Sequence, residues 1–573
     1  MEPEFTSIEA AVEYLTSSEE LYAIDEVDIR GIHLKVFANA ATHVGELLNL
    51  CDDYGDAEFL VFENERYTFT DFKDRVDALA KALQFKYGVS KGERVAICMR
   101  NYPEYLIAIM AIASLGAITV FLNSWWTTSE LEYGFTDSEA RLVLADGPSA
   151  ERIAPFSDQL GITYILVRSE AKNQTNYSDL MAETYPEPQP ITDIHADDDM
   201  AIMYTSGSTG HPKGVVQTHR GAISAVMSWV MSGRIADLMG TTLSPPTDKT
   251  GKDLQPASLI TTPLFHVSAT HACFLLGLVA GAKLVIMNKW NAEQAVNFIE
   301  QENITRFFGV PTMSADLVET ARQMGKTLDT IRSLDAGGAK RPASQVGEIV
   351  EAFPHADPRT GYGLTETNGL GLGIGGKDYV DQPGVAGHLY PPLQEMRIVA
   401  NNGTEVPRGK VGEITLRSAA NMRCYLNKPS ETEQALKHGW LYTGDLGTVN
   451  EQGIVTIVDR KKDIIIRGGE NISCLEVDAA LHRHKAIAEA AVFSIPHERL
   501  GETIGAGVQL YPGKRLTEAD LQEFLRKHLS AFKVPEKVWF LEALPRGATE
   551  KTDRRALRIE CLGKDAGTLI VST

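Results

Sequence analysis

Residues 95–123, VAICMRNYPEYLIAIMAIASLGAITVFLN, decide the fold class of this chain. A strand-like run leads through the Asn-Tyr-Pro sequence at 101–103 into an apolar segment of helix length, and Gly116 separates that segment from a second strand-like run. The uncharged part, residues 105–122, just reaches the length of a membrane span. Because Gly116 divides it into a helix-length half and a strand-length half, we expect a buried helix–strand unit and no transmembrane segment.

The same alternation continues along the chain. Further strand-like runs at residues 141–145, 162–167 and 200–204 alternate with segments of helix length. Strands that alternate with helices indicate a parallel sheet covered by helices. The predicted fold class is therefore α/β.

The length of 573 residues exceeds what one hydrophobic core usually supports. We expect a large N-terminal domain of parallel-sheet subdomains with helices, residues 1–459, and a small mobile α+β C-terminal domain, residues 460–573. Residues 458–462 read as the linker between them.

Composition narrows the class of partner. With 55 basic and 76 acidic residues the formal charge is −21, which disfavours binding to nucleic acid or anionic lipid. The six cysteines form no CxxC pair, so neither a zinc site nor a disulfide framework is expected and a reducing cytoplasm fits. The first ten residues lack the basic and apolar regions of a signal peptide. A small-molecule substrate is the better expectation, and a homodimer is left open.

The strand at 200–204 leads into residues 205–214, TSGSTGHPKG. Glycines let backbone N–H groups close around phosphate oxygens, hydroxyl groups add donors, and Lys213 supplies positive charge. The lysine is followed by Gly214 and a strand-like run, whereas a Walker loop continues into a helix. The segment therefore predicts a phosphate-binding loop of another kind.

This loop resembles that of the adenylate-forming superfamily, which includes acyl-CoA synthetases, peptide-synthetase adenylation domains and beetle luciferases. Other segments resemble the motifs of that superfamily in the same order along roughly residues 45–558, which chance rarely produces. They are PLFH at 263–266, AGGA at 336–339, YGLTET at 362–367, GEI at 412–414, YTGDLG at 442–447, DRKKD at 459–463 and PRGATEK at 545–551.

The resemblance implies a role for each matched residue. Lys551, Thr365 and Glu366 would be catalytic, with Glu366 also holding Mg²⁺, a metal that prefers hard oxygen ligands. His266, Gly338 and Gly363 would line the acyl pocket, and Lys462 would be the hinge. ATP and AMP would contact Thr205, Ser206, Gly207, Ser208, Thr209, Gly210, Lys213, Gly338, Ala339, Tyr362, Thr365, Asp445 and Arg460.

The resemblance also implies the reaction. A carboxylic acid would attack the α-phosphate of MgATP, and the acyl-adenylate would then react with a thiol. We expect coenzyme A as the thiol, held by Gly468, Gly469, Phe532 and Lys533. A free-standing enzyme that loads a carrier protein is the alternative, followed by luciferase-like oxygenation and an ATP-binding relative without turnover.

The acid is predicted from two segments. Residues 31–39, GIHLKVFAN, and residues 123–127, NSWWT, resemble bacterial fatty-acyl-CoA ligases more than aryl-acid ligases. We therefore expect a medium- or long-chain fatty acid, with an aryl-acid CoA ligase as the alternative.

Three features depart from simple expectations. Glu550 precedes the predicted catalytic lysine where the family usually has glycine, and Cys474 replaces a usual proline near the hinge. Residues 371–376, GLGIGG, match the dinucleotide fingerprint GxGxxG. We reject that match because we expect no helix after it and predict a loop near the acyl pocket.

Overall fold

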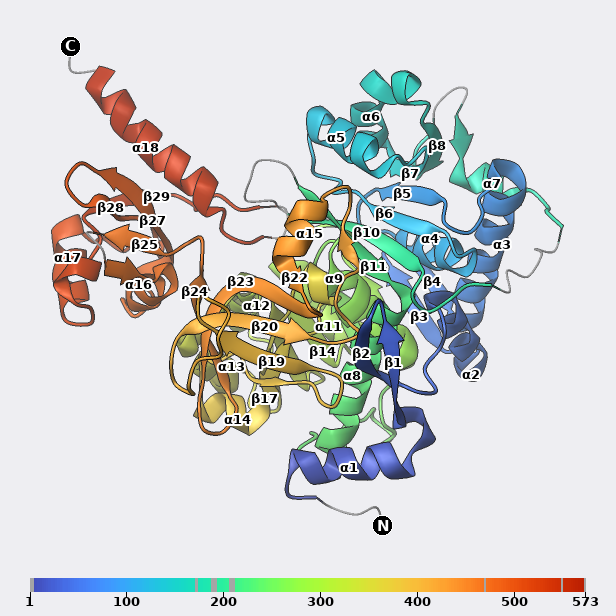
Figure 1. Ribbon diagram of the computed structural model, residues 1–573, viewed down its shortest axis with the longest axis horizontal. Coiled ribbons are helices and arrows are strands. Elements are labelled where there is room, and N and C mark those ends of the chain that lie inside the picture. Colours follow the sequence, from blue (N-terminus) through green and yellow to red (C-terminus); the bar gives the residue numbers. More distant parts are fainter. Residues whose placement is uncertain are drawn as a thin grey trace.

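The computed structural model describes residues 5–170, 174–186, 193–205, 212–467, 470–547 and 550–570, the last six as backbone only. It is a mixed α/β protein with a large N-terminal domain and a smaller C-terminal domain (Figure 1). Among the described residues no helix combines the length and apolar character that a membrane span needs.

The first sheet of the large domain contains the phosphate-loop strands at one end. At that end β11 and β21 are antiparallel to their neighbours, and the strands from β10 to β8 are parallel to one another. In spatial order the strands are β21 (Cys424–Tyr425), β11 (Lys213–Thr218), β10 (Asp199–Thr205), β6 (Ile118–Phe121), β5 (Arg94–Cys98), β7 (Leu142–Asp146), β8 (Thr163–Val167) and β9 (Thr175–Asn176).

The second sheet is parallel from β16 to β3 and antiparallel at both ends. In spatial order its strands are β18 (His388–Leu389), β17 (Leu372–Gly375), β16 (Asp357–Tyr362), β15 (Ser333–Gly337), β14 (Arg306–Gly309), β12 (Ala257–Ile260), β13 (Lys283–Ile286), β3 (Glu58–Phe62) and β4 (Glu65–Thr68).

The opening stretch of sequence forms the centre of the large domain. Helix α4 (Pro103–Ser114) is buried on all sides from Pro103 to Ala113 and contacts β5 and β6 of the first sheet and β3 of the second. Gly116 has a φ of 64° and turns the chain into β6. The predicted helix–strand unit is confirmed. The main core also takes in α3 (Phe69–Tyr87) and one face of α8 (His219–Leu238) along its whole length.

A third, antiparallel sheet leads to the small domain. It contains β19 (Glu395–Val399), β20 (Gly412–Arg417), β23 (Trp440–Val449), β22 (Leu436–Lys437) and β24 (Val455–Arg460). The predicted linker at 458–462 is wrong in its first half, because β24 remains paired with β23 as far as Arg460.

The last sheet follows β24 in the chain and belongs to the small domain. The sheet contains β26 (Glu470–Ile472), β25 (Ile465–Arg467), β28 (Gly501–Leu510), β27 (Ile487–His497) and β29 (Lys537–Leu541), with helices α16 (Cys474–Leu481), α17 (Glu518–Arg526) and α18 (Arg554–Ile570). The chain just before α18 reaches across to the large domain (Figure 1).

The expectation of a loop at residues 371–376 is wrong. The segment forms β17, and helix α14 (Gly376–Asp381) opens directly after it. An ion pair between Lys377 and Asp381 and the buried ring of Tyr379 support this short helix. The dinucleotide fingerprint still does not apply, because its glycines must form the turn between strand and helix, whereas Gly373 lies inside an antiparallel strand.

Candidate functional site

The ends of the predicted phosphate loop come together in a hairpin. Thr205, the last residue of β10, pairs with Lys213, the first residue of β11. The Lys213 ammonium group lies 4.7 Å from the centre of the Tyr425 ring. Ser206, Gly207, Ser208, Thr209 and Gly210 lie outside the described residues.

The predicted metal ligand lies on a short turn after β16. Thr365 and Glu366 belong to a 3-10 turn, η4 (Thr365–Thr367). The side chain of Gln217 donates to the Thr365 carbonyl oxygen at 2.9 Å, and the Glu366 carbonyl oxygen accepts from the backbone N–H of Met422 at 2.7 Å. These two bonds fix the turn against β11 and the segment before β21.

The Glu366 side chain fits a shared magnesium site. One carboxylate oxygen, Oε1, accepts a hydrogen bond of 2.7 Å from the Tyr425 hydroxyl. A carboxylate is the kind of hard ligand that Mg²⁺ takes together with nucleotide phosphates. The described residues contain no cluster of three His, Cys, Asp or Glu side chains that could hold a metal by themselves. Glu366 would therefore share the ion with ATP.

Three of the predicted nucleotide contacts, Tyr362, Asp445 and Arg460, meet in space. The Asp445 carboxylate is buried, accepts from the Tyr362 hydroxyl at 2.7 Å and pairs with Arg460 Nε at 3.1 Å. Burial raises the pKa of Asp445, while the charge of Arg460 and the Tyr362 hydrogen bond oppose the rise. Each carboxylate oxygen can accept two hydrogen bonds. Both oxygens therefore keep capacity for a ribose hydroxyl.

Two glycines form the turns around this site. Gly338 follows β15 with a φ of 76°. At Gly363, just after β16, any side chain would overlap the backbone carbonyl of Gly369. Both positions therefore favour glycine, the residue without a Cβ. Ala339 lies next to Gly338 and is exposed.

Lys551 of the small domain enters the large-domain site. A Cβ atom at Gly338 would stand 2.9 Å from Lys551 Nζ. Desolvation between the domains lowers the pKa of Lys551 to about 8, with the charge of Arg460 acting in the same direction and Asp445 opposing it. The lysine side chain keeps accessible surface. The predicted catalytic lysine therefore faces the predicted nucleotide site in this arrangement.

His266, the predicted acyl-pocket residue, lies near Lys551. Burial lowers the pKa of His266 to about 3, and the nearby charge of Lys551 adds to this effect. The Nε2 atom of His266 is buried and has no hydrogen-bond partner among the described residues. Val267, which follows His266 in the chain, and Trp229 of α8 lie against Gly369, 3.6 and 3.3 Å from where its Cβ would be. His266 is thus a neutral side chain with apolar residues near it.

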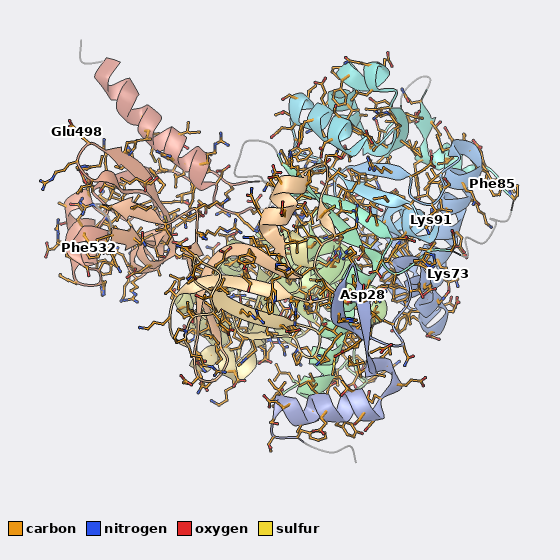
Figure 2. The ribbon with its side chains drawn as sticks, in the orientation of Figure 1. Asp28, Lys73, Phe85, Lys91, Glu498 and Phe532 are labelled. Atoms are coloured by element: carbon orange, nitrogen blue, oxygen red, sulfur yellow. The ribbon has the colours of Figure 1, made fainter. Side chains whose placement is uncertain are left out.

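Of the predicted coenzyme A contacts that the structure describes, Phe532 and Lys533 do not reach the site, whereas Lys462 lies near enough to Asp445 for its charge to lower the pKa of that carboxyl. Lys462 is exposed in the turn after β24, as a hinge would be. Lys533 pairs with Glu476 at 2.7 Å within the small domain. Figure 2 shows Phe532 on the side of the small domain away from the large domain. Gly468 and Gly469 lie outside the described residues.

Both departures from the family pattern have a structural account. Glu550 has a φ of 58°, a left-handed conformation that suits glycine. Its side chain lines a pocket together with Arg100, Trp125 and Lys289 of the large domain. Cys474 is the buried first residue of α16, and its thiol donates to the carbonyl oxygen of Asp463 beside the hinge at 2.9 Å. The first position of a helix accepts proline or another residue without loss of a helical hydrogen bond.

Sequence reasoning missed Tyr425 and Gln217. Both contact the Thr365–Glu366 turn from segments distant in the sequence. No local pattern marks either residue, because each contact depends on the pairing of β11 with β10 and β21.

Comparisons with known proteins agree with this geometry. The model of the AMP-binding enzyme family matches residues 49–426, and that of the AMP-binding enzyme C-terminal domain matches residues 476–551. The first match includes Glu366 and the second Lys551, whereas Asp445 and Arg460 lie between the two matched ranges.

Among curated proteins, feruloyl-CoA synthase of an Amycolatopsis species is 31% identical over 83% of this chain and 90% of its own length. Long-chain-fatty-acid–CoA ligase of Bacillus subtilis is 30% identical over 88% of this chain and 92% of its own length. A solved structure of o-succinylbenzoate CoA synthetase from Bacillus subtilis with its acyl-adenylate has a TM-score of 0.75 at 27% identity, covering 91% of this chain and 98% of its own. The chain therefore belongs to the AMP-binding enzyme family, as an AMP-forming acid–CoA ligase that uses ATP, Mg²⁺ and coenzyme A.

Proposed function

We propose that this enzyme activates a medium- or long-chain fatty acid to its CoA thioester, with Lys551 as the residue that stabilises the adenylation step. The assignment of Lys551 rests on two observations. Its side chain approaches Gly338, just after β15, and its charge lies close enough to His266 to lower the pKa of that imidazole. A protonated lysine there would lie between the nucleotide residues and the apolar acyl side.

In the first step an oxygen of the substrate carboxylate forms a bond to the α-phosphorus of ATP, and the bond from that phosphorus to the bridging oxygen breaks to release pyrophosphate. Negative charge builds on the α-phosphate oxygens, and fixed positive charges lower the energy of that state. Lys551 would face these oxygens and Lys213 the departing pyrophosphate. Bound Mg²⁺ would neutralise phosphate charge, held by Glu366.

The nucleoside would be held by Tyr362, Asp445 and Arg460. Asp445 accepts from Tyr362 and Arg460 and keeps acceptor capacity for ribose. Gly338 and Ala339 would lie against the adenine, and Tyr362 would stack on it. Precise placement of the α-phosphate relative to the acid is itself a large part of the rate enhancement in such reactions.

In the second step the sulfur of coenzyme A attacks the acyl carbon, the bond to AMP breaks, and the thiol proton leaves to solvent. In the arrangement that the structure shows, Lys551 would block the path of the thiol to the acyl carbon. The small domain would therefore have to move before the second step. We propose that it turns at the exposed Lys462, carrying Lys551 out and placing Gly468, Gly469, Phe532 and Lys533 toward coenzyme A, and that the domains divide at residues 459 and 460.

Apolar side chains near His266 support a hydrophobic acid. Trp229 and Val267, the residue after His266, lie against Gly369, and the neutral state of His266 adds no charge there. Burying an acyl chain there would gain about 0.8 kcal/mol for each CH₂ group. The fatty-acid ligase of Bacillus subtilis, similar to this chain along most of its length, supports the same class.

An aryl acid is the second candidate. It is favoured by the similarity to feruloyl-CoA synthase and to 4-coumarate–CoA ligase 3 of Oryza sativa subsp. japonica, which is 29% identical over 86% of this chain. A flat ring would also pack against the face of Trp229.

A pyrophosphate-release screen separates the two. Saturated acids of graded length and a matched set of hydroxycinnamic and benzoic acids are assayed with coenzyme A, with a carrier protein, and with neither thiol. Rates that rise with chain length, together with formation of acyl-CoA, support the fatty-acid proposal. A preference for cinnamic acids with no turnover of long chains would replace it by the aryl-acid function.

A further inference from the structure

Tyr425 contacts two groups that the reaction needs at the phosphate end of ATP. Its hydroxyl group donates to Glu366 Oε1 at 2.7 Å. The ring of the same side chain lies under the Lys213 ammonium group, 4.7 Å from the ring centre. Glu366 lies in the turn η4 and Lys213 in strand β11, so this one side chain joins two separate elements.

The backbone holds Tyr425 firmly in place. In β21 it is paired with Val215 of β11, and its N–H donates to Thr432 Oγ1 at 3.0 Å. On either side of it, the N–H of Leu426 donates to Gly214 at 2.7 Å and that of Arg423 to Val216 at 2.9 Å. The Tyr425 residue is only 9% exposed. A side chain so anchored has little freedom to follow Glu366 or Lys213, so it can set their positions.

We propose that Tyr425 is a positioning residue that orients the Glu366 carboxylate for Mg²⁺ and holds Lys213 toward the pyrophosphate end of ATP. The hydroxyl donates to Oε1, which fixes the rotation of the carboxylate and leaves Oε2 for the metal. The electron-rich ring face attracts the lysine ammonium group. The inference rests on the proposed roles of Glu366 and Lys213.

The two contacts can be separated by substitution. Tyr425→Phe removes the hydroxyl and keeps the ring, so it acts on Glu366 alone. Tyr425→Leu removes both contacts. A hydrogen bond to a charged group typically contributes enough that its loss changes an equilibrium about tenfold or more, and a partly exposed cation–π contact contributes a factor of about three.

The test measures binding rather than turnover. A non-hydrolysable ATP analogue is titrated into the full-length enzyme by calorimetry over a series of Mg²⁺ concentrations and without Mg²⁺. Mg²⁺ is expected to increase the affinity for the analogue. Tyr425→Phe should raise the Mg²⁺ concentration that gives half of this increase about tenfold, and it should leave the affinity measured without Mg²⁺ unchanged. Tyr425→Leu should in addition weaken metal-free binding about threefold. Tyr67→Phe is the control, because Tyr67 also donates to a carboxylate, Glu65, but at the far edge of the second sheet.

A double-mutant cycle completes the test. Glu366→Gln should remove most of the Mg²⁺ dependence, and adding Tyr425→Phe to it should then have little further effect. AMP binding without metal verifies that each variant is folded. If Glu366→Gln changes the Mg²⁺ dependence but Tyr425→Phe behaves like Tyr67→Phe, the positioning role is wrong and the proposed metal site stands. If Glu366→Gln itself has no effect, the proposed metal site fails and the inference fails with it.

Discussion

Lys551 of the small domain lies so close to Gly338 of the large domain that a Cβ at residue 338 would stand 2.9 Å from the lysine Nζ. The glycine therefore leaves the space into which the lysine fits. Its φ of 76° is also a conformation that other residues adopt at a cost. The approach of Lys551 to the large domain thus depends on the absence of a side chain at residue 338.

Gly338→Ala should slow acid-dependent ATP–pyrophosphate exchange by about tenfold or more, since a left-handed residue with a Cβ costs about 1–2 kcal/mol and the methyl group displaces Lys551. Thioester formation from a supplied acyl-adenylate should change less. Gly347→Ala in helix α13 (Ala343–Ala352) is the control, because a Cβ there meets no atom within 4 Å. Equal effects of the two substitutions would contradict the closure model.

The pKa of Lys551, lowered to about 8, predicts a pH dependence. The lysine carries its charge below that value and loses it above, so kcat/KM for adenylation, which reports the free enzyme, should fall as pH rises through about 8. Lys551→Arg should react more slowly but lose this alkaline limb, because arginine stays protonated. An unchanged limb in the arginine variant would assign the titration to another group.

Tyr362→Phe should weaken ATP and AMP binding by about tenfold or more, because it removes a hydrogen bond to the buried carboxylate of Asp445. The measurement is AMP affinity by calorimetry without metal, which isolates the nucleoside end from Glu366. Tyr67→Phe again serves as the control. AMP affinity equal to that of the unchanged enzyme would show that the contacts among Tyr362, Asp445 and Arg460 are structural only.

Glu550→Gly should speed the adenylation burst several-fold, because glycine relieves a left-handed conformation worth about 1 kcal/mol. Glu550→Ala removes the carboxylate but keeps the Cβ, so it separates strain from charge. If strain is the cause, rapid-quench burst rates increase in the glycine variant only. A slower burst in both variants would instead show that the carboxylate, in its pocket with Arg100 and Lys289, holds the domains together.

The sequence predicted those parts of the fold that local pattern determines. Continuous apolar runs around Gly116 and before Thr205 identified buried strands and helices, and the structure confirms them. Helix α14 was missed because it is short, six residues, and depends on one ion pair and one buried ring. The strand character of residues 458–460 was missed because it comes from pairing with β23.

The site residues likewise fall into those that the sequence identified and those that it did not. Motif residues such as Asp445, Glu366 and Lys551 were identified by resemblance, and Tyr362, Asp445 and Arg460 do meet in space. Tyr425 was not identified, since its contact with Glu366 joins a turn and a strand that are 59 residues apart. The roles of Phe532 and Lys533 stay predictions, because they lie within the small domain away from the nucleotide residues in this arrangement.

The most direct test of the central claim compares the unchanged enzyme with Lys551→Ala in acid-dependent ATP–pyrophosphate exchange, with ATP affinity measured in parallel. Loss of a fixed charge at the reacting phosphate typically costs about 10²–10³ in rate. We predict an exchange rate lowered by at least that factor with ATP affinity changed only a few-fold. An exchange rate in Lys551→Ala equal to that of the unchanged enzyme would contradict the account.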